Sequence, residues 1–124
     1  DLRAVAPVLA VRGNVDSTGL GLPDSLLLSF VRDGGAILEA LVVHIGLWST
    51  RIAGPVRDRA RRLGAWLVLC GHSHVPFLGR DGELVVVNPG SCGPRRFQLP
   101  ITFACIDLGA EIAIFHVDCE TGAR

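Results

Sequence analysis

The sequence predicts a layered α/β fold in a single domain. Three observations support this prediction: short apolar segments typical of buried strands, one segment with the pattern of a surface helix, and glycine-rich turns between them. The chain has 124 residues, which is enough for one hydrophobic core. It starts at Asp1 and contains no Met, so we expect residues 1–124 to be one domain that lacks its N-terminal part.

Each expected strand is a short apolar run that ends close to a turn residue. The predicted strands cover residues 7–11, 26–31, 37–43, 66–70, 84–87, 101–107 and 112–117. Hairpin turns are predicted where Gly follows Asp, at residues 33–35 and 80–82, and around residues 108–111. The polar or glycine-containing segments between these runs are expected to be loops.

Residues 55–63 are the one predicted helix. Pro55 suits the first turn of a helix, and Gly64 is a natural end. The apolar side chains of this segment fall on one helical face, and they are Val56, Ala60 and Leu63. Its arginines are predicted to form a solvated surface, and they are Arg57, Arg59, Arg61 and Arg62.

Composition excludes several classes of function. The formal net charge is zero, so no general attraction to nucleic acid or to an anionic membrane is indicated. No apolar run reaches the ~18 residues that a membrane-spanning helix needs, and no signal-peptide pattern is present, so a cytoplasmic location is expected. The four cysteines are Cys70, Cys92, Cys105 and Cys119. They show no C-x-x-C spacing, and we interpret them as buried free thiols rather than as disulfides or a zinc site.

Polar side chains gather where the expected strands end. His72 and His74 follow the strand at residues 66–70, directly after Gly71, and similar positions are occupied by Asn14 and His44. Loops at strand ends bring side chains together on a rigid frame. Three imidazoles and one amide oxygen suit Mn, Fe or Zn better than Mg or Ca. These residues therefore predict a metal site, whereas His116, inside the last strand, is interpreted as structural.

Four segments resemble, in order and spacing, the motifs of the calcineurin-like metallophosphoesterases. They are Gly13-Asn14-Val15-Asp16, Val43-His44-Ile45-Gly46, Gly71-His72-Ser73-His74-Val75-Pro76 and Asn88-Pro89-Gly90-Ser91. The resemblance is greatest to the small phosphodiesterases of that superfamily. It implies a four-layer α/β/β/α sandwich, of which this chain would be the C-terminal two thirds.

The resemblance also implies a role for each motif residue. Asn14, His44 and His72 would bind the second metal, and His74 would bind the first. Asp16 would brace the Asn14 loop, and Asn14, Asp16 and His72 are the implied catalytic residues. Residues 88–91 would shape the floor of the site. Arg95 would contact a phosphate oxygen, unless Arg95 and Arg96 form a solvated surface pair.

The implied reaction is hydrolysis of a phosphodiester by a hydroxide that bridges two divalent metals. Mn is the expected metal, with Fe, Zn, Ni and Co left open. The substrate would be a small phosphate ester or a nucleotide. Larger members of the superfamily have a proton-donating His at the position of Val15, so leaving groups of low pKa are favoured here.

Two departures from the family pattern leave other interpretations open. The D-x-H and G-D-x-x-D motifs, which precede the first segment in the family and supply most first-metal ligands, are not found in this chain. Ile45-Gly46 stands where the family has Gly-His. The alternatives are an inactive scaffold for protein assembly, like the retromer subunit of the same family, and a structural site for one metal at Asn14, His44 and His72. An exposed strand edge would also favour homo-oligomers.

Overall fold

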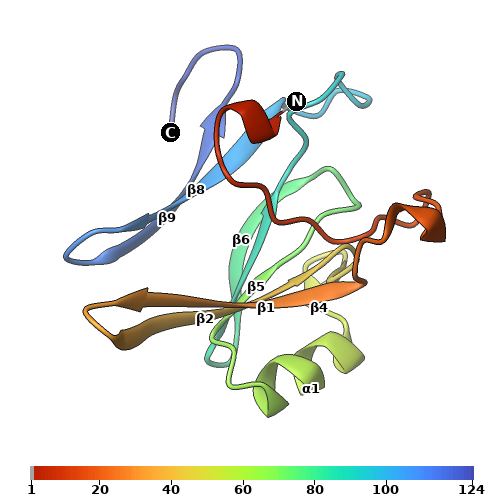
Figure 1. Ribbon diagram of the computed structural model, residues 1–124. Helices are drawn as coiled ribbons and strands as arrows, with labels where there is room; N and C mark the ends of the chain where they lie inside the picture. Colours follow the sequence, from red (N-terminus) through yellow and green to blue (C-terminus); the bar gives the residue numbers. More distant parts are fainter. Residues whose placement is uncertain (1) are drawn as a thin grey trace.

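A mixed five-stranded sheet forms the centre of the structure, a computed structural model that describes residues 2–124 (Figure 1). Its strands, in spatial order, are β1 (Ser25–Arg32), β2 (Gly35–Val43), β5 (Leu67–Leu69), β7 (Leu84–Pro89) and β6 (Pro76–Asp81). The three inner strands β2, β5 and β7 are parallel, and β1 and β6 run antiparallel at the two edges. The carboxyl ends of the inner strands therefore meet at one edge of the sheet.

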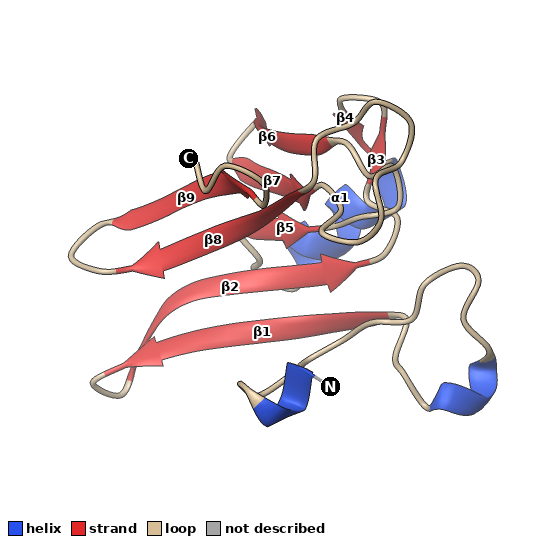
Figure 2. Cartoon of the chain, turned by 90° about the horizontal axis from the view of Figure 1, so that it is seen from above, coloured by secondary structure: helices blue, strands red, loops and turns tan. Residues whose placement is uncertain are grey.

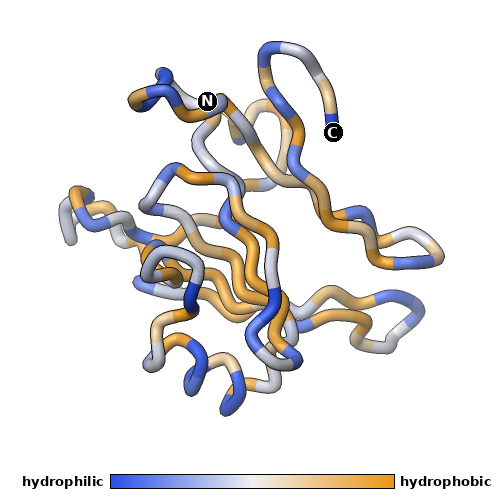
Figure 3. The backbone as a smooth tube through the Cα atoms, turned by 180° about the vertical axis from the view of Figure 1, so that it is seen from behind, coloured by the Kyte–Doolittle hydropathy of each residue, from blue (hydrophilic) through white to orange (hydrophobic). Residues whose placement is uncertain are grey.

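The inner strands are buried because both faces of the sheet are covered. The helix α1 (Gly54–Arg62) packs on one face, where Ala60 joins Leu41, Val68 and Val86 in a buried cluster. A hairpin of β8 (Thr102–Leu108) and β9 (Ile112–Asp118) covers the other face (Figures 1 and 2). Strands that are covered on both faces need apolar side chains on both faces, and Figure 3 shows that the strands of the sheet are apolar along most of their length.

The expected strands and helix are confirmed with one exception, and the α/β class is confirmed with them. Three strands were not predicted: the two-residue strands β3 (Leu47–Trp48) and β4 (Arg51–Ile52), and the edge strand β6. Two 3-10 turns were also not predicted, and they are η1 (Leu2–Ala4) and η2 (Thr18–Leu20). Helix, sheet and hairpin are three of the four expected layers. Within residues 2–124 no second α-helix lies over the hairpin.

The strand predicted at residues 7–11 is not formed. This segment is apolar, and Val11 lines a cavity of about 320 Å³ between the sheet and the hairpin. Leu9, however, is 71% exposed, and no described strand pairs with the segment. An apolar run becomes a strand only when a neighbour accepts its backbone hydrogen bonds. The prediction was wrong because it rested on the apolar side chains alone, and no neighbouring strand is present among the described residues to pair with the backbone.

All four cysteines are free thiols, as predicted, but only Cys70 is fully buried. Burial raises the pKa of the Cys70 thiol to about 11. Cys92 and Cys119 are exposed because they lie in the loop after β7 and just beyond the end of β9. The prediction of burial is thus wrong for these two residues.

No helix among the described residues is both long enough and apolar enough to cross a membrane.

Candidate metal centre

Three predicted ligands converge at the carboxyl ends of the inner strands. Asn14 Oδ1 lies 2.8 Å from His44 Nε2 and 3.2 Å from His72 Nδ1, and the two imidazole nitrogens are 3.3 Å apart. The rings of His44 and His72 meet edge to face, with their centroids 5.1 Å apart. Three separate loops therefore present three donor atoms to one point.

The Asn14 loop is closed by Asp16. The Asp16 carboxylate accepts a hydrogen bond of 2.7 Å from the Gly13 main-chain N–H, and the Asp16 N–H bonds back to the Gly13 carbonyl at 3.2 Å. A Cβ at residue 13 would lie 3.0 Å from the carboxylate and 3.6 Å from the His44 ring. The contact with the carboxylate is the tight one, so glycine at residue 13 lets the Asp16 side chain fold back closely onto this turn.

The His44 loop is held against the neighbouring strand end. The Gly71 N–H donates to the His44 carbonyl at 2.9 Å, which joins the two histidine-bearing loops through their backbones. A Cβ at Gly46 would lie 2.6 Å from Cβ of Cys70. The Gly46 of this motif thus has a packing reason that the sequence alone did not reveal.

Both histidines of the Gly71–His74 loop lie in the left-handed region. The φ angle is 71° at His72 and 61° at His74, a conformation that costs a residue with a Cβ about 1–3 kcal/mol. Backbone strain of this kind persists where surrounding contacts impose it, and it concentrates at functional sites.

Asn88 supplies those contacts from beneath the loop. Its side chain is fully buried, and its Nδ2 donates to the Gly71 carbonyl and to Ser73 Oγ, each at 2.9 Å. Its Oδ1 accepts from the Gly90 N–H at 3.0 Å. His116 Nε2 donates to the Asn88 main-chain carbonyl at 2.7 Å. Ser73 and His116 are the supporting residues that sequence reasoning did not assign to the site.

The surroundings keep His44 in the form that can bind a metal. Burial lowers the pKa of the His44 imidazole, and the neighbouring His72 lowers it further, while Asp16 partly opposes them. A lowered pKa favours the neutral ring at physiological pH. A neutral imidazole has the free electron pair that a metal ion needs.

The donor set fits one divalent ion. Two ligands at right angles on an ion with bonds of about 2.1 Å lie about 3.0 Å apart, and the three donor separations scatter around that value. Within residues 2–124 no site combines three His, Cys, Asp or Glu side chains as possible ligands. The present cluster has two such side chains, His44 and His72, and its third donor is the amide oxygen of Asn14. The ion would thus have three protein ligands and open positions.

Two predicted residues lie outside this cluster. His74 belongs to the same loop and its charge acts on His44, but no hydrogen bond joins it to the three donors. Arg95 is bound elsewhere: its guanidinium pairs with Glu120 and donates to the Leu99 carbonyl at 2.9 Å. A contact between Arg95 and a phosphate would require this ion pair to open.

Taken together, the sheet, its helix and the hairpin define a layered α/β domain with a cluster of candidate metal ligands at one edge. The chain belongs to the calcineurin-like phosphoesterase superfamily, since the sequence profile of that superfamily's domain matches residues 1–111.

Two curated relatives, each described as "Probable metallophosphoesterase", are archaeal. The protein of Methanothermobacter thermautotrophicus is 29% identical over 101 residues, which is 81% of this chain and 56% of the relative. That of Methanocaldococcus jannaschii is 30% identical over 96 residues, which is 73% of this chain and 44% of the relative. The chain thus spans about half the length of these relatives.

Solved structures share the fold at low sequence identity. A Streptococcus pneumoniae protein described as a predicted phosphoesterase has a TM-score of 0.67 and 23% identity, and the match covers 92% of this chain and 64% of that one. Vps29 of Entamoeba histolytica, complexed with zinc, has a TM-score of 0.66, 19% identity and coverage of 94% and 72%. A structure described as a novel archaeal phosphodiesterase has a TM-score of 0.62, 20% identity and coverage of 91% and 70%. The metallophosphoesterase fold is therefore confirmed.

Proposed function

We propose that this chain is part of a metal-dependent phosphodiesterase and that Asn14, His44 and His72 hold one of its metal ions. The observation that carries the proposal is the convergence of their three donor atoms within 3.3 Å of one another. Membership of the superfamily supports it, since that family works with divalent metals. Mn is the first metal to test, and a small phosphate ester or a nucleotide is the proposed substrate.

Bound divalent metals would supply a water of lowered pKa and neutralise charge on the phosphate oxygens. The residues of this chain would do the rest. Asn14, His44 and His72 hold and orient one ion, and His74 binds its neighbour. Asp16 and Asn88 keep the two loops in the geometry that the ligands need.

At the position of Val15, next to Asn14, the chain offers the leaving group no proton donor. Val15 follows Asn14, is 89% exposed and carries no polar atom. A leaving group that departs without a proton must be a weak base. We therefore propose that esters with leaving groups of low pKa, such as phenols with electron-withdrawing substituents, react faster than alkyl esters.

In this proposal, carboxylates from outside residues 1–124 complete the first metal site. The three-donor cluster and His74 leave that site short of ligands, and the curated relatives are about twice as long as the match. The domain described here would then be the C-terminal part of the catalytic domain.

The decisive experiment measures metal content and hydrolysis together. The chain is equilibrated with Mn²⁺, bound metal per chain is measured by mass spectrometry, and hydrolysis of bis(p-nitrophenyl) phosphate is followed. We expect at least one ion per chain, lost in His72→Ala and retained in Gln98→Ala, an exposed control. A chain that folds and binds no divalent ion would refute the proposed metal site. Turnover is expected once the upstream residues are included in the chain.

The second candidate is a scaffold for protein assembly. The observation that favours it is the small ligand cluster, which holds three donors rather than the larger set of a two-metal centre. One bound ion, combined with no turnover in the longer chain that includes the upstream residues, would support this scaffold.

A further inference from the structure

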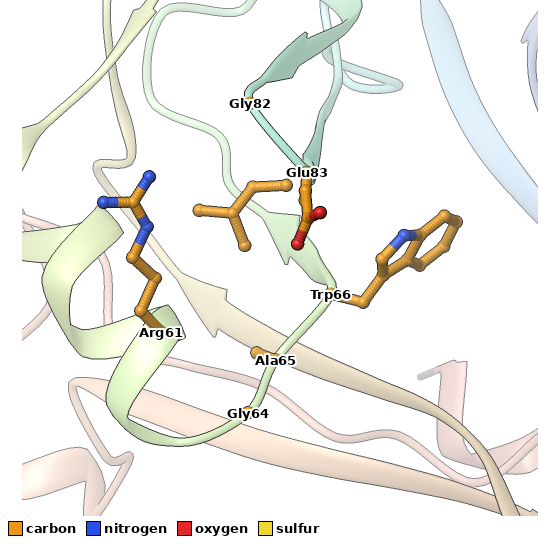
Figure 4. Close-up of a pocket in the computed structure, with 7 residues that line it drawn as sticks. Arg61, Gly64, Ala65, Trp66, Gly82 and Glu83 are labelled. Carbon is orange, nitrogen blue, oxygen red and sulfur yellow. The ribbon is translucent and has the colours of Figure 1, made fainter.

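Four arginines surround the turn between β6 and β7, at the end of the sheet away from the metal centre. Two cavities of about 480 Å³ each adjoin there and share Gly82 as a lining residue. Arg51 of β4, Arg57 of α1 and Arg80 of β6 line one cavity. Arg61 of α1 lines the other, and Figure 4 shows it opposite Glu83.

The helix presents two of these arginines on one face. Arg57 and Arg61 are four residues apart, so they project from the same side of α1. Arg57 pairs with Asp81 at 3.3 Å, and an Arg61 nitrogen lies 3.9 Å from where a Cβ of Gly82 would be. The sequence predicted that all the helix arginines would form one solvated surface. Instead, Arg57 and Arg61 face the turn, whereas Arg62 lines neither cavity.

Half of this positive charge is not balanced by the carboxylates that line the same cavities. Within residues 2–124, no carboxylate pairs with Arg51, Arg61 or Arg80. Four guanidinium groups thus face two carboxylates, those of Asp81 and Glu83, which leaves a formal excess of two positive charges. The whole chain has a net charge of zero, so this excess is a local feature.

The excess matches one phosphate group. A phosphate monoester carries about 1.5 to 2 negative charges at neutral pH, and the planar fork of arginine binds phosphate through two parallel hydrogen bonds. Each cavity also has the volume of a site for a small molecule. A nucleic acid would need a longer basic stripe than this cluster offers.

The cluster is separate from the metal centre. Leu84, which lines one cavity, and Asn88, which supports the histidine loop, are four residues apart on β7. At about 3.3 Å per residue, these positions are about 13 Å apart along the strand.

We propose that the arginines around the β6–β7 turn form a second site, which binds the phosphate group of a small phosphorylated molecule. The site does not depend on the metal centre, and its occupant need not be the substrate. Its arginines come from β4, α1 and β6.

Amide NMR of the chain tests this proposal with inorganic phosphate as the probe, at low ionic strength and with chloride as the matched anion. We expect saturable shifts at Thr50, Asp81 and Gly82. Arg51→Ala should weaken phosphate binding roughly ten-fold, as loss of a charged hydrogen bond does. Arg80→Ala should act similarly, and Arg62→Ala should have no effect.

Four results would overturn the proposal. The first is the absence of saturable shifts around Gly82, and the second is an equal loss of affinity in Arg62→Ala and Arg51→Ala. The third is binding of single-stranded DNA more tightly than pyrophosphate or a nucleoside monophosphate, which would replace the small molecule with a nucleic acid. Shifts confined to Gly71–His74 would place the phosphate at the metal centre and would leave the proposed function intact while refuting this second site.

Discussion

Replacing Asn88 with alanine is expected to destabilise the fold and the metal centre together. The change removes three side-chain hydrogen bonds, to the Gly71 carbonyl, to Ser73 Oγ and from the Gly90 N–H. Each is worth about 1 kcal/mol net, so the free energy of unfolding should fall by about 3 kcal/mol. For a domain of this size that corresponds to a fall in Tm of roughly 12 °C.

The metal affinity should fall as well. Asn88 is not one of the candidate ligands, but it holds the loop in which His72 has a left-handed backbone. Loss of such a supporting residue lowers metal affinity about 10- to 100-fold. Thermal unfolding followed by circular dichroism gives the Tm, and a competition titration with a zinc indicator gives the affinity.

Asn14→Ala is the matched control. Asn14 is exposed and its side chain bonds to His44 and His72 alone among the described residues. Its loss should lower metal affinity while changing the free energy of unfolding by less than about 0.5 kcal/mol. If Asn88→Ala melts within 2 °C of the unaltered chain, roughly the effect of 0.5 kcal/mol, the buried hydrogen-bond network does not stabilise the loop as argued.

Three further outcomes are expected. Gly90→Ala should lower the free energy of unfolding in urea by about 3 kcal/mol, because φ is 82° there and a Cβ would lie 2.1 Å from Thr102 Oγ1. The control Gly122→Ala has a similar φ of 73° but open space around the Cβ, and it should lower that free energy by about 1 kcal/mol. Equal losses in the two variants would contradict the predicted clash with Thr102. The thiol of Cys70 has its pKa raised from 9.0 to about 11 in the folded chain, so its contribution to stability should be constant below pH 9 and fall as the pH rises to 11. The chain has no Lys or Tyr to titrate in that interval, and Tm against pH in Cys70→Ala should therefore be flatter; an unchanged slope would rule Cys70 out. Iodoacetamide at pH 8 should modify exposed Cys92 in the folded chain and Cys70 only after unfolding, as peptide mass spectrometry would show.

The sequence predicted those elements whose signal is local. The apolar run of β2 and the faces of α1 depend on neighbours a few residues away, and both formed where expected. The edge strand β6 was not predicted because Gly79 and Arg80 interrupt its apolar pattern. It forms because its backbone pairs with β7 in an antiparallel ladder. The failure at residues 7–11 has the converse cause, an apolar pattern without a neighbouring strand.

The same division separates the candidate ligands from the residues that support them. Asn14, His44 and His72 each follow a Gly or a strand end, so motif spacing identified them before any contact was known. His116 reaches Asn88 only because β8 and β9 pair in one particular register. Arg95 likewise meets Glu120, which lies 25 residues away. No local pattern encodes such contacts.

The β8–β9 hairpin contacts the strand beneath the candidate metal centre through the hydrogen bond from His116 Nε2 to the Asn88 carbonyl. Its backbone joins the rest of the chain at the bridge between Ser91 and Ile101, and its apolar side chains rest on the sheet. Such a unit can open cooperatively at a free energy below that of global unfolding. Opening would withdraw His116 from the Asn88 carbonyl, so an ion that locks the loop above Asn88 should also close the hairpin. Metal binding should then slow hydrogen exchange along β8 and β9, two strands that supply no ligand.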